Sequence, residues 1–171
     1  GGYSRETRFN FQPGIAEPGI KTVILSRDRN CSIQTVSRTV YAPTAVWIDK
    51  VNKHAPVDIG YHLSPVYQLQ PFNHALQDSF LIGLRYEHQY SGHSKMGIYY
   101  YDRKEQQWTY TPTKNNPKRQ ILTTSLDQFD AVTIIQDLEH PKILKTIPAH
   151  GGHYKTEDIT KIKIDVDDDL S

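Results

Sequence analysis

The sequence predicts an all-β protein whose main unit is a β-sandwich. Short apolar or alternating runs, bounded by turn residues, occur along most of the chain, with little sustained helical periodicity. The clearest run is 80–86, in which every second residue is Phe, Ile, Leu or Tyr and therefore falls on one face. Large aromatic residues recur in these runs and could fill the gap of about 10 Å between two stacked sheets. The aromatics expected in that gap are Tyr67, Phe80, Tyr86, Tyr99, Tyr101, Trp108 and Phe129.

In the first half of the chain, strands are expected at 3–11, 21–26, 32–40, 45–48 and 67–69. Pro-Gly pairs at 13–14 and 18–19 predict a linker between the first two strands. The stretch 45–53 is the one place where a helix competes with a strand.

In the second half, strands are expected at 80–86, 96–101, 108–111, 120–125 and 129–135. The polar residues 102–105 predict a hairpin turn between the second and third of these strands, and 114–117 predicts another turn. A second, smaller unit is expected from about Asp137, with strands at 143–147 and 159–166 around a turn at 148–154.

Several of these stretches resemble a known type of domain. The stretches are Ser64-Pro-Val-Tyr-Gln-Leu-Gln-Pro71, Phe80-Leu-Ile-Gly-Leu-Arg-Tyr86 and Gly97-Ile-Tyr-Tyr-Tyr-Asp102, followed by Trp108 and Phe129. Together they resemble the ZU-type β-sandwich of ankyrins and netrin receptors, whose bacterial relatives occur in long exported proteins. The resemblance implies a ZU-like sandwich here.

The two ends of the chain resemble pieces of bacterial immunoglobulin-like domains. Pro141-Lys-Ile, Pro148, Gly151 and the stretch 165–171 are similar to the opening half of such a domain, and Gly1-Gly2-Tyr3-Ser4 is similar to a last strand. The expected division is therefore 1–20 as the end of a preceding module and linker, 21–136 as the ZU-like sandwich, and 137–171 as the first part of an immunoglobulin-like domain. An exported parent protein would carry its signal peptide upstream of Gly1.

The same combination is similar to the non-catalytic regions of lysostaphin-like zinc endopeptidases. The catalytic core of that family carries a His-x-x-x-Asp pair and a His-x-His pair as zinc ligands, and this chain is not expected to hold that set because it has no His-x-His pair. The resemblance thus implies that any peptidase activity of the parent protein resides outside this chain. No cofactor is expected.

Charge and cysteine content narrow the possible partners. Twenty basic and nineteen acidic residues give a net charge of +1, which offers no general attraction to nucleic acid. Lys114, Lys118 and Arg119 are too few for a phosphate-binding surface. The apolar runs are far shorter than the ~20 residues that span a bilayer, so no membrane insertion is expected. The single Cys31 cannot form an internal disulfide and is expected to be buried or inert.

Two groups of polar residues are candidate metal sites. Asp165, Asp167 and Asp168 belong to a dense acidic cluster that could bind calcium through carboxylate oxygens, although a solvated turn is the favoured interpretation. The pairs His150/His153 and His88/His93 flank turn residues and lack a third ligand at recognisable spacing, so turns with surface histidines are expected there.

An aromatic platform for sugar is the remaining candidate site. In a strand, Tyr99 and Tyr101 face one way and Tyr100 the other, so core packing of most of these rings is expected. Tyr100 and Tyr110 are the residues expected to be available for ligand binding.

The functional hypothesis is a non-catalytic structural or interaction module of a larger exported bacterial protein, located in the periplasm, at the cell surface or in the medium. Its partners would be other domains of the same chain and, in an alternative, cell-wall or surface polysaccharide. A further alternative is an accessory region of a cell-wall zinc endopeptidase.

Overall fold

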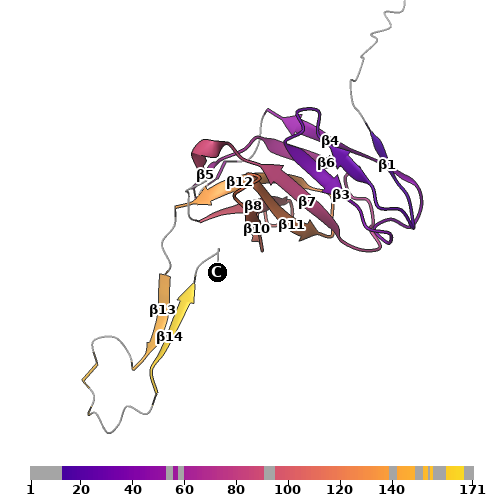
Figure 1. The fold of residues 1–171 in the computed structure, drawn as a ribbon. Helices are drawn as coiled ribbons and strands as arrows, with labels where there is room; N and C mark the ends of the chain where they lie inside the picture. The colour runs from indigo at the N-terminus through magenta and orange to yellow at the C-terminus, as the bar shows by residue number, and fades with distance from the viewer. Residues whose placement is uncertain are drawn as a thin grey trace, which may run out of the picture.

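The computed structural model confirms the all-β prediction (Figure 1). It describes residues 13–52, 56–57, 60–90, 95–138, 142–148, 152–153, 155 and 161–167. Within these ranges the strands are joined by turns and by one 3-10 helix, η1 (His88–Tyr90). No helix among the described residues is long and apolar enough to cross a bilayer. The strand expected at 3–11 lies outside the described residues.

The larger sheet has seven antiparallel strands. They are β1 (Gly14–Ala16), β4 (Thr44–Val51), β5 (Gly60–His62), β6 (Val66–Gln70), β8 (Met96–Asp102), β9 (Gln107–Thr111) and β12 (Ala131–Asp137). Their order is β1-β4-β6-β12-β8-β9, and β5 pairs with the end of β12. β12 is central because β6 and β5 lie on one side of it and β8 on the other.

The smaller sheet has five antiparallel strands. They are β2 (Val23–Leu25), β3 (Cys31–Gln34), β7 (Phe80–Arg85), β10 (Lys114–Asn116) and β11 (Ile121–Leu126), in the order β10-β11-β7-β3-β2. β7 therefore lies in the middle, paired with β3 and β11. This sheet packs face to face with the larger one (Figure 1).

Side-chain alternation explains how the two sheets share one core. Along β7, Phe80, Ile82 and Leu84 are buried, whereas Leu81 and Arg85 are exposed. The same alternation on the other strands closes the interior with fully buried residues, among them Ile33, Leu69, Ile98, Leu122, Val132 and Ile134. Burying alternating faces in this way is the main source of stability in a sandwich.

The prediction of the core aromatics is correct for four residues and wrong for three. Tyr67, Phe80, Tyr86 and Phe129 belong to the core cluster. Tyr99, Tyr101 and Trp108 lie instead on the outer face of the larger sheet, where Tyr99 is nevertheless buried. The strand pairing is the reason, because Tyr100 pairs with the inward-facing Val132 and so takes the inner face.

Several strand boundaries also differ from the sequence prediction. The stretch 45–53 is not a helix: β4 runs from Thr44 to Val51 and buries Val46 and Ile48. The strand expected at 32–40 ends at Gln34, because the Thr39 hydroxyl accepts a hydrogen bond from the Val36 amide in a turn.

Two stretches expected to be linker or turn are strands. β1 lies in the predicted linker and pairs with β4, although Pro13 and Pro18 flank it closely. β10 begins at Lys114 and pairs with β11, so the turn expected at 114–117 is displaced to Pro117–Gln120. Both are three-residue edge strands, too short for a sequence pattern to reveal.

The last two strands, β13 (Lys142–Ile147) and β14 (Lys163–Asp167), form a separate two-stranded sheet (Figure 1). They pair antiparallel with a bulge between Ile143 and Lys145. This places strands near the positions expected for the second unit. The domain division itself stays a prediction.

Candidate functional site

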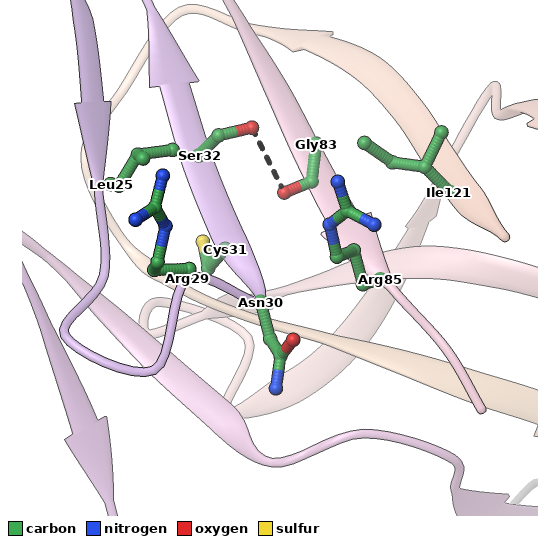
Figure 2. A pocket seen from close by; sticks show the side chains of 8 residues that line it. All are labelled: Leu25, Arg29, Asn30, Cys31, Ser32, Gly83, Arg85 and Ile121. Atoms are coloured by element: carbon green, nitrogen blue, oxygen red, sulfur yellow. Dashed lines mark hydrogen bonds between the residues drawn. The ribbon is translucent and has the colours of Figure 1, made fainter. Parts of the chain in front are cut away.

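The outer face of the five-stranded sheet contains a depression of about 360 Å³ (Figure 2). Its lining residues are Leu25, Arg29, Asn30, Cys31, Ser32, Gly83, Arg85 and Ile121. They come from β2, β3, β7, β11 and the turn between β2 and β3. Strand pairing brings them together, since Ser32 pairs with both Leu25 and Gly83, and Arg85 pairs with Ile121.

Gly83 contributes only backbone atoms to this surface and is itself buried. Its neighbours in the strand pairing leave no vacant position for a side chain: a Cβ there would lie 2.7 Å from Ser32 Oγ and 3.1 Å from Ile121 Cδ1. The Ser32 hydroxyl donates a long hydrogen bond of 3.4 Å to the Gly83 carbonyl across the strand pair. The Ser32 and Ile121 side chains therefore lie close over the Gly83 backbone.

Two arginines line this depression. Figure 2 shows Arg29 and Arg85 on opposite sides of the Ser32–Gly83 hydrogen bond, with both guanidinium groups extending along the same direction. Both side chains are exposed. Among the described residues, neither guanidinium has an ion-pair or hydrogen-bond partner. Asp28, the nearest acidic residue in sequence, contacts other residues instead.

The Asp28 carboxylate interacts with four groups. Its carboxylate accepts hydrogen bonds from the Ser26 and Tyr67 hydroxyls at 2.7 and 2.8 Å, and from the Asn30 amide. Lys50 Nζ lies 3.7 Å away. Partial burial acts to raise the pKa of Asp28, but these hydrogen bonds and the lysine charge outweigh it and hold the pKa below its usual value.

Cys31 lies beneath the depression and is only 1% exposed. Burial, with a smaller contribution from the Asp28 charge, raises the pKa of its thiol well above the usual value. A thiol of this kind stays protonated near neutral pH and is a poor nucleophile. The expectation that Cys31 is buried is confirmed.

The predicted aromatic residues lie on two different faces of the larger sheet. Tyr100 is half-buried and packs against the core, whereas Tyr110 lies on the outer face opposite Tyr99, with ring centroids 5.5 Å apart. Trp108 contacts the rings of Tyr101 and His62 edge to face, at 5.3 and 5.4 Å. Tyr100 and Tyr110 therefore cannot contribute to one binding platform.

The outer face of the larger sheet holds a second aromatic group, defined here as the outer aromatic cluster: His62, Tyr99, Tyr101, Trp108 and Tyr110. His62 enters it from β5, where its Nδ1 is 3.1 Å from Thr133 Oγ1. Tyr99 is almost fully buried, while Tyr101, Trp108 and Tyr110 are partly exposed. Part of this cluster is thus accessible from solvent.

The candidate calcium residues are only partly described. β14 continues through Asp165 and Asp167, and Asp165 forms an ion pair of 2.7 Å with Lys163. Asp168 lies outside the described residues. Within the described part of the chain, His, Cys, Asp and Glu side chains do not form any group of three that could hold a metal ion.

The candidate histidine pairs are also only partly described. His88 begins η1 and is exposed, and His153 is exposed, whereas His93 and His150 lie outside the described residues. A His-x-x-x-Asp spacing does occur at His74 and Asp78. His74 Nε2 lies 3.2 Å from Thr44 Oγ1, and Asp78 accepts a hydrogen bond from the neighbouring Ser79 amide.

Sequence patterns do not reveal the arginine-flanked depression. Alternation along 80–86 places Gly83 and Arg85 on the outer face of a strand, but it does not identify the strand beside it. Arg29 reaches the same surface because β3 pairs with β7 across about 50 residues of chain. In comparisons with known proteins, the chain matches no protein-family model and no curated protein.

Proposed function

We propose that this chain is a non-catalytic structural or interaction module of a larger exported bacterial protein, and that the β13–β14 hairpin is its contact with another domain of that protein. The observation that carries this proposal is the exposed apolar face of the hairpin. Ile162 is 76% and Ile164 56% exposed, although they alternate with the charged Lys163 and Asp165. A strand with this alternation normally buries its apolar face.

A partner for the hairpin is also expected from its size. An isolated two-stranded sheet is marginally stable in water, and three or more strands or a packed face are usually needed. The opposite face carries Lys145, which pairs with Asp165, and the Asp165–Lys163 ion pair, with Ile147 as its one exposed apolar side chain among the described residues. Covering Ile162 and Ile164 would therefore add a one-sided core to the hairpin. An immunoglobulin-like unit, which the sequence resembles around this hairpin, would supply such a cover.

Hydrogen exchange tests this proposal. The backbone amides of β13 and β14 should exchange at least about tenfold more slowly in the intact parent protein than in the 171-residue chain, because a covered sheet opens less often. The β7 amides serve as the control and should exchange alike in both. Equal exchange of the hairpin in the two proteins would contradict the proposal.

A matched pair of substitutions locates the contact. In the parent protein, Ile164→Ser should abolish most of the hairpin protection, whereas Lys163→Ser on the other face should leave it unchanged. Equal effects of the two substitutions would count against an apolar interface on the Ile164 face.

Carbohydrate binding is a second candidate function, supported by the partly exposed rings of the outer aromatic cluster. Aromatic faces beside polar groups are typical of sugar-binding surfaces, and the Trp108, Tyr101 and Tyr110 rings lie together. A pull-down on peptidoglycan should then be weakened by Trp108→Ala and Tyr110→Ala. Tyr100→Phe, on the core side, should have no effect. Binding that survives both alanine substitutions would eliminate this candidate.

A further inference from the structure

We propose that the arginine-flanked depression binds an acidic peptide segment of a partner protein, with peptide carboxylates on Arg29 and Arg85 and an aliphatic side chain against Leu25 and Ile121. This inference concerns the five-stranded sheet and does not depend on the hairpin. Exposed guanidinium groups pair with carboxylates through two parallel hydrogen bonds, and arginine clusters are a recurrent means of recognising acidic motifs.

The charge of this surface is local and uncompensated. The chain as a whole is nearly neutral, with a net charge of +1. Asp28 precedes Arg29 in the chain, but its carboxylate accepts hydrogen bonds from Tyr67 and Ser26 and forms an ion pair with Lys50. Arg29 and Arg85 thus face solvent without a counter-charge among the described residues.

Two further basic residues extend the positive region. Lys118 and Arg119 lie in the turn between β10 and β11, and both are exposed. The Gln120 carbonyl in the same turn accepts a hydrogen bond from the Tyr86 amide, which directly follows Arg85. The positive charge therefore continues past one end of the depression. An extended chain with several carboxylates can contact more of it than a single small anion.

The lining of the depression favours a peptide over a sugar. Its margins include the aliphatic side chains of Leu25 and Ile121, and its described lining residues include no aromatic ring. Leu25 is 40% exposed, and the nearby Val23 and Leu81 on the same face are 61% and 43% exposed. Aliphatic side chains of a peptide would cover this apolar surface, whereas sugar rings usually stack on aromatic faces.

Selection from a random heptapeptide display library against the whole chain tests the proposal. The selected peptides should be enriched in Asp or Glu flanking an aliphatic residue. A synthetic peptide of the selected sequence, followed by fluorescence anisotropy, should bind measurably, and its Glu→Gln and Asp→Asn counterpart should bind at least about tenfold more weakly, the loss expected for charged hydrogen bonds. Selection of peptides without acidic residues, or of none, would overturn the proposal.

Exposed-residue variants assign the binding to this surface. Arg85→Gln and Arg29→Asn should each weaken binding of the selected peptide on the order of tenfold. Asn is chosen at position 29 because the residue has a φ of 59°, a conformation that Asn tolerates. Arg38→Gln removes the same charge from an exposed turn elsewhere and should change affinity less than about twofold, as for a screened distant charge.

The remaining outcomes also decide the question. If Arg38→Gln weakens binding as much as Arg85→Gln, the interaction is non-specific attraction and the proposal is wrong. Heparin and vesicles containing phosphatidylglycerol serve as alternative anions in competition with the selected peptide. If either binds more tightly than the peptide and depends on Arg29 and Arg85, the occupant is a polyanionic glycan or a membrane surface and the peptide assignment fails.

Discussion

The Tyr67 hydroxyl donates a hydrogen bond of 2.8 Å to Asp28 Oδ2 and thereby joins the two sheets of the sandwich. Tyr67 belongs to β6 of the larger sheet, whereas Asp28 lies in the turn that leads into β3 of the smaller one. The aromatic ring is fully buried, so the hydroxyl crosses the core to reach the carboxylate. The same carboxylate orders the turn through Ser26 and the Asn30 amide.

Removal of this hydroxyl should destabilise the fold. Tyr67→Phe leaves the buried ring in place but removes one donor to a charged acceptor, which should lower the free energy of unfolding by about 1–2 kcal/mol. Urea denaturation measures the change. Tyr61→Phe is the control, because the Tyr61 hydroxyl contacts Gln136 on an exposed surface and its loss should change stability by less than about 0.5 kcal/mol. Equal effects would contradict the bridging role of Tyr67.

The lowered pKa of Asp28 predicts a pH dependence. Its folded-state pKa lies below the unfolded value of about 3.9, so its stabilising contribution is complete above that value and is lost as pH falls through the folded pKa. The stability difference between the wild-type chain and Asp28→Asn should therefore shrink below about pH 4. Denaturation at several pH values gives this difference.

The comparison with Asp28→Asn is necessary because Asp130 acts in the opposite direction. Burial raises the pKa of Asp130, despite its hydrogen bonds with the Ala131 amide and Arg103, so protonation of Asp130 favours the folded state. Both chains share this contribution, and it cancels in their difference. A gap that stays constant into strong acid would refute the assignment to Asp28.

Two aromatic truncations distinguish the core from the outer face. Phe80 is 1% exposed and packs against Phe129 with ring centroids 5.0 Å apart, so Phe80→Ala should cost about 3–5 kcal/mol. Trp108 is partly exposed on the outer face, and Trp108→Ala should cost clearly less, about 1–2 kcal/mol. Chemical denaturation of both variants checks the order, and a larger loss for Trp108 would mean that its face is assigned wrongly.

Gly60→Ala should detach β5 from β12. A Cβ at this position would lie far inside contact distance of the Gln136 carbonyl and 2.9 Å from its carbon, both backbone atoms that cannot rotate away. The expected loss is about 1–3 kcal/mol, as for other overpacked sites, with faster amide exchange at Tyr61 and His62. Gly19 differs from Gly60 in the cause of the strain that alanine would introduce. No atom lies within 4 Å of a Cβ at Gly19, but its φ of 85° disfavours any side chain. Unchanged exchange in β5 of Gly60→Ala would disprove the close contact.

Local patterns were sufficient to predict most of the strands, because alternation records which face of a strand is buried. The run 80–86 is the clearest case, since its four alternating apolar residues all enter the core. The pattern at 96–101 is ambiguous: three consecutive tyrosines carry no alternation, and only the pairing of Tyr100 with Val132 decides which ring faces inward. The same limit hides the candidate site, whose Arg29 and Arg85 are neighbours through strand pairing alone.

The alternating faces of β7 provide the most direct test of this account, because one face fills the core and the other contributes to the proposed binding surface. Single cysteines placed at Leu81, Ile82, Leu84 and Arg85 can be labelled with a maleimide in the native state and read by mass spectrometry, with the buried Cys31 as an unreactive internal reference. The structure predicts rapid labelling at 81 and 85 and slow labelling at 82 and 84. Uniform labelling along the strand, or fast labelling at 82 and 84 with protection at 81 and 85, would contradict it.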